Sequence, residues 1–97
     1  MRIISRKKLK EFWEQHPDSE ASLRAWFHEA EKAEWRHNSD IKAKYRTASI
    51  LSSERVIFNI CGNKYRLIVH MNFSFQIAYI RFIGTHSQYD RVDAEKI

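Results

Sequence analysis

Arginine, histidine and tyrosine side chains in the second half of the chain can together cleave a phosphodiester bond. The guanidinium group of Arg66 can hold phosphate through two parallel hydrogen bonds. His86 can exchange protons near neutral pH, and Tyr89, three residues further on, can stack on a base or orient a phosphate. Cleavage of RNA without a metal needs a base for the 2′-hydroxyl, an acid for the leaving oxygen and a cation for the phosphorane. These three side chains can divide those tasks.

A predicted strand positions Arg66. Period-two alternation indicates three strands: Arg55–Ile60, Lys64–Met71 and Phe75–Ile83. Gly62-Asn63 predicts a two-residue hairpin turn between the first two, and Asn72-Phe73-Ser74 predicts the next turn. Because alternate side chains share a face, Lys64, Arg66 and His70 should form a basic row, with Lys64 and His70 contacting RNA.

Arg81 lies among apolar neighbours in the third predicted strand. A charged side chain in such a setting requires an anionic partner. A structural carboxylate and an RNA phosphate both meet that requirement, and the residues alone leave the two open.

Two amphipathic helices precede the strands. The first is expected from Ser5 to about Gln15, and the second begins after Pro17, with Asp18 or Ser19 as its cap, and ends between Trp35 and Asn38. Met1–Ile4 is a candidate short strand, and 38–53 an ordered connection with a helical turn. The pattern predicts an α+β fold over residues 1–97, a single domain with two N-terminal helices packed on a small antiparallel sheet.

Positive charge is concentrated at the start of the first helix. The net charge of +5 favours polyanionic partners. Four cations occupy the first turns of this helix: Arg6, Lys7, Lys8 and Lys10. Cations there oppose the helix dipole and cost stability. Because the chain tolerates this cost several times, Arg6, Lys7 and Lys8 indicate an RNA-facing patch. A solvated face balanced by glutamates explains them equally well.

Several classes of function lack their signatures. The five histidines include no i, i+4 helical pair and there is one cysteine, so neither a metal site nor any cofactor is expected. Two glycines exclude the glycine-rich nucleotide-binding patterns, and no motif indicates a covalent nucleophile. No apolar run approaches about 18 residues, so no membrane contact is expected, and the single cysteine fits a reducing cytoplasm.

Two stretches, FNICGNKYRLIV and YIRFIGTHSQYD, resemble the HigB family of bacterial toxins within the RelE superfamily. The stretch from Trp35 to Ser49 also fits that family. The resemblance implies a RelE-like fold and a metal-independent endoribonuclease (mRNA interferase) that inhibits translation by cutting mRNA in the ribosomal A site. It places catalytic roles on Arg66 and His86, with Lys64 and Tyr89 as helpers.

The resemblance also implies partners. A HigA-type helix-turn-helix antitoxin encoded alongside would neutralise the toxin, and operator DNA would be contacted only through that antitoxin. ParE-like relatives on the same fold are instead non-enzymatic poisons of DNA gyrase. His86 and Tyr89 favour the ribonuclease, because a gyrase binder needs no proton donor. An RNA-binding module or a decayed toxin is a third possibility.

Overall fold

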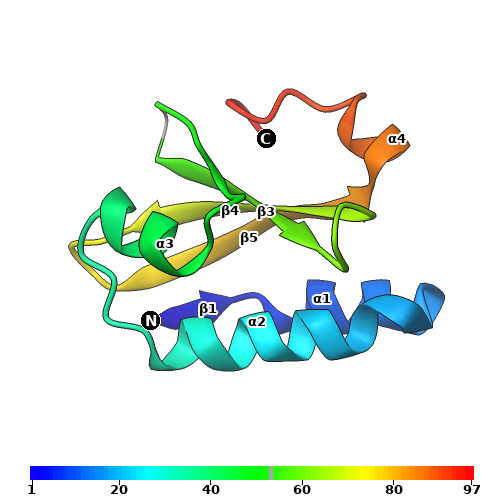
Figure 1. The fold of residues 1–97 in the computed structure, drawn as a ribbon, viewed down its shortest axis with the longest axis horizontal. Coiled ribbons are helices and arrows are strands. Elements are labelled where there is room, and N and C mark those ends of the chain that lie inside the picture. Colours follow the sequence, from blue (N-terminus) through cyan, green and yellow to red (C-terminus); the bar gives the residue numbers. More distant parts are fainter. Residues whose placement is uncertain (53) are drawn as a thin grey trace.

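The computed structural model describes residues 1–52 and 54–97, in which five strands form one sheet in the order β1-β5-β4-β3-β2. The strands are β1 (Arg2–Ile4), β2 (Ser49–Ile50), β3 (Arg55–Ile60), β4 (Tyr65–Asn72) and β5 (Ile77–Thr85). The helices are α1 (Arg6–Gln15), the 3₁₀ turn η1 (Pro17–Ser19), α2 (Glu20–Lys32), α3 (Asn38–Lys44) and α4 (His86–Tyr89). Figure 1 shows α1 and α2 beneath one face of the sheet and α4 at one end of the other.

The predicted α+β class is confirmed, with two N-terminal helices on a sheet. The sheet is mixed, because the short N-terminal strand joins the predicted antiparallel strands in the parallel direction. β1 pairs in parallel with β5, with Arg2 opposite Ile77 and Ile4 opposite Tyr79. Alternation along a strand shows which side chains share a face, but it does not show which strand becomes its neighbour.

The first two helices bury apolar residues at helical spacing. Leu9 and Trp13 of α1 are buried, as are Leu23, Trp26 and Ala30 of α2. α2 ends at Lys32, before the predicted end. The ammonium group of Met1 donates to the carbonyl groups of Ala30, Glu31 and Ala33 at 3.0, 2.9 and 2.8 Å. It places a positive charge at the C-terminal end of α2, where the helix dipole favours one.

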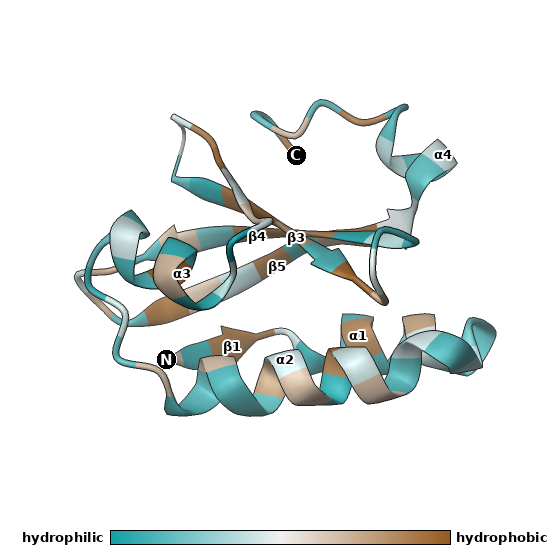
Figure 2. Ribbon diagram, in the orientation of Figure 1, coloured by the Kyte–Doolittle hydropathy of each residue, from teal (hydrophilic) through white to brown (hydrophobic). Residues whose placement is uncertain are grey.

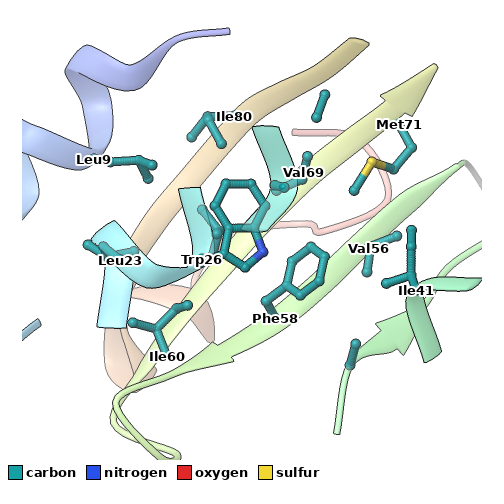
Figure 3. Packing of buried hydrophobic residues seen from close by; sticks show 14 of the residues in the cluster. Leu9, Leu23, Trp26, Ile41, Val56, Phe58, Ile60, Val69, Met71 and Ile80 are labelled. Atoms are coloured by element: carbon teal, nitrogen blue, oxygen red, sulfur yellow. The ribbon is translucent and has the colours of Figure 1, made fainter. Parts of the chain in front are cut away.

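Phe58 lies at the centre of the core (Figure 3). Its ring centroid is 5.3 Å from that of Trp26 on α2 and 5.1 Å from that of Tyr45, which follows α3. The ring of Trp35 stacks on it at 6.4 Å. Phe58 therefore joins both helical segments to the sheet.

Phe58→Ala should lower the free energy of unfolding by about 3–5 kcal/mol, because it leaves a cavity where these rings meet. Urea denaturation followed by tryptophan fluorescence measures the loss. Phe75→Ala is the matched control: Phe75 is 76% exposed, so its removal should cost less than about 0.5 kcal/mol. Equal losses in the two variants would contradict this account of the core.

The β3–β4 hairpin has a longer loop than predicted. Ile60 pairs with Tyr65, so the connection is 61–64 and not a two-residue Gly62-Asn63 turn. Cys61 and Gly62 have positive φ angles of 55° and 68°. A positive φ is uncommon for a residue other than glycine, which is why the sequence pattern did not indicate this turn. Lys64 consequently lies in the loop and not in the strand.

β5 contains an irregularity at Arg81. Ile68 of β4 pairs with Phe82 and the next residue, Val69, pairs with Ile80, so Arg81 is an additional residue in β5. Side-chain alternation therefore reverses here, and Phe82 does not share a face with Ile80. β5 also begins at Ile77, later than predicted, because 73–76 form the turn after β4. Ser53, the last residue of the predicted connection, lies outside the described residues.

The face of the sheet away from the long helices is partly apolar. Ile57 and Ile68 are 5% and 0% exposed, yet neither belongs to the helix-side core. The segment after α4 returns over this face (Figure 1), and Arg55 donates to the carbonyl of Ile97 at 2.9 and 2.7 Å. Figure 2 shows mainly hydrophilic residues in α4. This polar end carries the candidate site.

None of the helices in the described part of the chain is long and apolar enough to span a membrane.

Candidate active site

Arg66 and His86 meet at the end of the sheet where β5 passes into α4. The β4–β5 register places Arg66 opposite Gly84, two residues before His86. Nη2 of Arg66 lies 2.7 Å from Nε2 of His86. A guanidinium group can only donate, so the lone pair of Nε2 accepts this hydrogen bond and the ring proton is on Nδ1. Nδ1 in turn lies 3.9 Å from Oδ1 of Asp90.

Tyr89 completes this group. Its ring centroid is 5.7 Å from the guanidinium carbon of Arg66 and 6.3 Å from the imidazole centroid of His86. Residues three apart lie on the same side of a helix, which brings His86 and Tyr89 together. The structure thus places the three predicted catalytic side chains within contact of one another.

A capping box starts α4 and fixes its direction. Thr85 Oγ1 accepts from the backbone N–H of Gln88 at 3.2 Å, and Gln88 Oε1 accepts from the N–H of Thr85 at 2.9 Å. Gly84 lies beneath this cap. A Cβ atom there would lie 2.5 Å from Cζ of Phe82 and 2.8 Å from Oε1 of Gln88. The absence of a side chain at Gly84 therefore lets the Phe82 ring and the Gln88 side chain pack closely against the strand beneath the site.

Asn63 is a member of the site that the sequence analysis did not assign. Its Oδ1 accepts a hydrogen bond of 2.6 Å from Nη1 of Arg66. The guanidinium group is therefore held through both terminal nitrogens, by Asn63 from the hairpin loop and by His86 from α4. Two hydrogen bonds from different elements thus fix the orientation of the guanidinium group. The sequence signal that could have identified Asn63 was its position in the predicted turn, three residues before Arg66.

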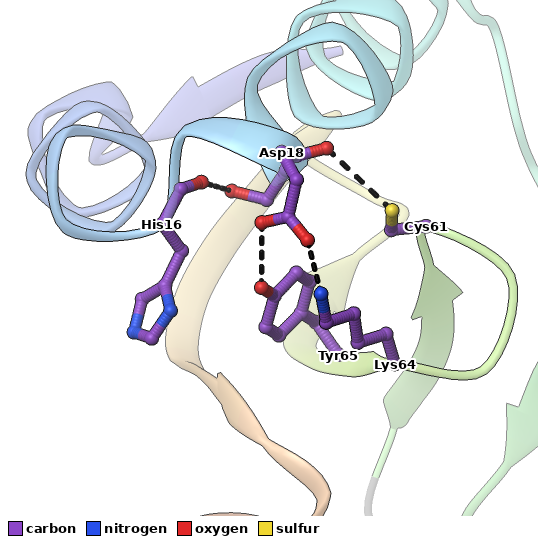
Figure 4. A network of polar contacts seen from close by, with 6 residues as sticks. His16, Asp18, Cys61, Lys64 and Tyr65 are labelled. Atoms are coloured by element: carbon purple, nitrogen blue, oxygen red, sulfur yellow. Dashed lines mark hydrogen bonds and ion pairs between the residues drawn. The ribbon is translucent and has the colours of Figure 1, made fainter.

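Lys64 lies apart from this group. It forms an ion pair with Asp18 of η1, and the hydroxyl of Tyr65 donates to the same carboxylate at 2.6 Å (Figure 4). The sequence analysis assigned Asp18 or Ser19 to the cap of the second helix, but neither side chain caps α2. Asp18 instead joins the turn between α1 and α2 to the hairpin that carries Asn63. We call Asp18, Lys64 and Tyr65 the hairpin latch.

The hairpin latch should stabilise the fold in a pH-dependent way. The hydrogen bonds from Lys64 and Tyr65 lower the pKa of Asp18 from its ordinary value of 3.8. A lowered carboxyl pKa contributes stability that is present above the unfolded value and is lost as pH falls through the folded value. Asp18→Asn should therefore be less stable than the parent protein at pH 7, and this difference should shrink below about pH 3.8.

Urea denaturation at pH 7 and pH 3 measures this difference. Lys64→Met alone and combined with Asp18→Asn completes a double-mutant cycle. The cycle should show coupling at pH 7 that weakens at pH 3. Coupling of the same size at both pH values would contradict an ionic latch.

His70 and Arg81 form a second group on the outer face. His70 is paired with Arg55 on β3 and Tyr79 on β5, and the guanidinium carbon of Arg81 lies 5.4 Å from the Tyr79 ring centroid. Burial and the charges of Arg55 and Arg81 lower the pKa of His70, which favours its neutral form. Four residues of strand, about 13 Å, separate His70 from Arg66.

The cations at the start of α1 point in different directions. The guanidinium carbon of Arg6 lies 5.5 Å from the ring centroids of Trp13 and Phe27, between α1 and α2. Nζ of Lys8 donates to the carbonyl of Ile80 on β5 at 3.4 Å. Lys7 is exposed. Arg6 and Lys8 therefore contact different parts of the molecule.

Within residues 1–52 and 54–97, no cluster of three or more histidine, cysteine, aspartate or glutamate side chains is placed to hold a metal ion.

Comparison with known proteins identifies the family. A sequence model of the HigB_toxin family, described as the RelE-like toxic component of a toxin-antitoxin system, matches residues 19–92. This chain belongs to the HigB toxin family. As a toxic component it has an antitoxin as its counterpart. Arg66, His86 and Tyr89 lie within the matched range, and the resemblance drawn from the sequence is confirmed.

Curated relatives cover nearly the whole chain. The mRNA interferase toxin HigB of Escherichia coli strain K12 is 28% identical over 92 residues, which are 93% of this chain and 88% of the relative. The proteins named mRNA interferase HigB from Escherichia coli O157:H7 and Shigella flexneri match with the same identity and coverage.

Proposed function

We propose that this HigB-family protein is an mRNA interferase, an endoribonuclease whose reaction is carried out by Arg66, His86 and Tyr89. The observation that carries the proposal is the 2.7 Å contact between Nη2 of Arg66 and Nε2 of His86, beside Tyr89 and open to solvent. It joins a phosphate-binding group to a proton-transfer group at reacting distance. The names of the curated relatives support the same activity.

The contact suggests how the site responds to substrate. A phosphate offers two oxygen acceptors to a guanidinium group and binds it more strongly than a neutral imidazole does. When the scissile phosphate binds the guanidinium group of Arg66, this group no longer donates to Nε2 of His86. The lone pair of Nε2 then becomes available. His86 can then accept the proton of the adjacent 2′-hydroxyl.

The reaction that follows needs only these side chains. The 2′-oxygen bonds to phosphorus, and the bond from phosphorus to the 5′-oxygen of the next nucleotide breaks. Arg66 stabilises the extra negative charge of the phosphorane. Tyr89 donates a proton to the leaving oxygen and regains one from solvent, and His86 releases to solvent the proton that it accepted. The products are a 2′,3′-cyclic phosphate and a 5′-hydroxyl end, and no metal ion takes part.

The site also accords with cleavage on the ribosome. Lys64 is paired with Asp18 and His70 lies about 13 Å from Arg66, so these two predicted RNA contacts do not surround the reacting group. We propose that translating ribosomes present the message in the A site, and that a HigA-type antitoxin neutralises the toxin.

His86→Ala should abolish message cleavage, because it removes the proton acceptor. The test induces the protein in bacteria and maps new mRNA 5′ ends over the following minutes. Cuts within translated codons should appear with the parent protein and with the control His28→Ala, an exposed histidine on α2. They should be absent with His86→Ala. Full cleavage by His86→Ala would remove this residue from the mechanism.

Arg66→Ala should reduce the cleavage rate by about 10²-fold or more through lost stabilisation of the phosphorane. Arg66→Lys keeps the charge but loses the two parallel hydrogen bonds, so it should also be impaired. Single-turnover cleavage on purified programmed ribosomes measures both rates. Full activity of the lysine variant would mean that charge alone suffices.

Intact messages together with growth arrest and DNA damage would favour the ParE-like gyrase poison instead.

A further inference from the structure

The outer edge of β5 is only half covered by a strand. β1 pairs with Ile77–Tyr79, and beyond Tyr79 the described residues provide no strand partner on that side. α1 lies alongside this part of β5. Between them is a groove of about 490 Å³, which we call the edge groove. Its lining includes Lys8, Phe12, His16, Arg81, Phe82 and Gln88.

The edge groove combines cations with flat rings. Lys8 and Arg81 contribute positive charge, against a single carboxylate from Glu11. The ring of Phe12 and the imidazole of His16 stack with centroids 4.4 Å apart and planes 23° apart. The Phe12 ring meets the buried Tyr65 ring in a T-shaped contact with centroids 5.1 Å apart, which anchors the stack to the core. Cationic grooves with stacking rings bind single-stranded nucleic acid.

The edge groove is continuous with the candidate active site. The Phe82 ring covers Gly84, which lies opposite Arg66. Gln88 belongs to the same short helix as His86. From Gly84 back to Arg81 is three residues of strand, about 10 Å. A polynucleotide with a phosphate on Arg66 can therefore cross the edge of β5 into the groove.

An added protein strand fits this edge less well. Strand addition needs free backbone groups along the edge. Lys8 already donates to the Ile80 carbonyl, and α1 occupies the space beside the strand. The charge and the stacked rings favour RNA.

We propose that the edge groove binds an unpaired nucleotide of the message next to the cleaved bond. Its base stacks on His16 and its phosphate is held by Lys8 and Arg81. This inference rests on the proposed function and adds a subsite to it.

The test uses purified toxin and ribosomes programmed with a defined message, in single-turnover cleavage. Lys8→Glu should raise the half-saturating toxin concentration about tenfold and leave the maximal rate within about twofold. Lys10→Glu is the matched control: it makes the same charge change on the same helix, outside the groove lining, and should change the half-saturating concentration less than twofold.

A message with an abasic nucleotide beside the cut tests the stacking. The parent protein should bind it about tenfold more weakly than the intact message, and His16→Ala should bind both messages equally. The subsite would be overturned if Lys8→Glu and Lys10→Glu changed the half-saturating concentration equally. It would also be overturned if His16→Ala still bound the abasic message more weakly than the intact one. So would groove variants that cleave normally but lose antitoxin binding. If the parent protein cleaves no message, the proposed function fails and the subsite with it.

Discussion

The pairing of β4 with β5 is the constraint on which the rest of the molecule depends. One face of this pair carries Leu67, Val69, Ala78 and Ile80 into the core against α1 and α2. On the other face the same register brings Arg66 opposite Gly84, from which the chain turns directly into α4. A shift of one residue would exchange the two faces and separate Arg66 from His86. The burial that stabilises the fold therefore also fixes the geometry of the site.

Local interactions then refine the position of Arg66. The hairpin latch ties the loop 61–64 to the turn between the helices, and Asn63 from that loop holds one end of the guanidinium. The capping box sets the direction of α4 and thereby holds His86 at the other end. His86 is exposed and Arg66 and Tyr89 are half-buried, while the elements that hold them are anchored in the core.

Much of this arrangement follows from the sequence, because periodicity reports directly on burial. The alternation around Arg66 and the amphipathic pattern of the two helices predicted both the fold class and the face that carries the basic side chains. His86 and Tyr89 follow directly after the third predicted strand, and the structure places them in α4 near that face. The resemblance to HigB toxins named the same residues, and the family match confirms the resemblance.

Other features depend on contacts that no local pattern reports. Lys64 pairs with Asp18, 46 residues away in the chain, so its alternation with Arg66 was a poor guide to its position. The longer hairpin loop depends on a left-handed conformation at Cys61, and the irregularity at Arg81 reverses the side-chain alternation in β5. β1 pairs in parallel with β5, which lies near the other end of the chain, and the sequence around β1 does not show which strand becomes its neighbour.

The central claim is that Arg66 and His86 direct attack by a 2′-hydroxyl of the message. The most direct test uses ribosomes programmed with two messages that differ in one 2′-deoxy nucleotide, placed at the position whose hydroxyl would attack. The account predicts that the all-ribose message is cut to a fragment with a 5′-hydroxyl end, and that the single deoxy substitution abolishes cutting at that bond. Cleavage of the deoxy message at the same bond, or fragments with 5′-phosphate ends, would contradict it.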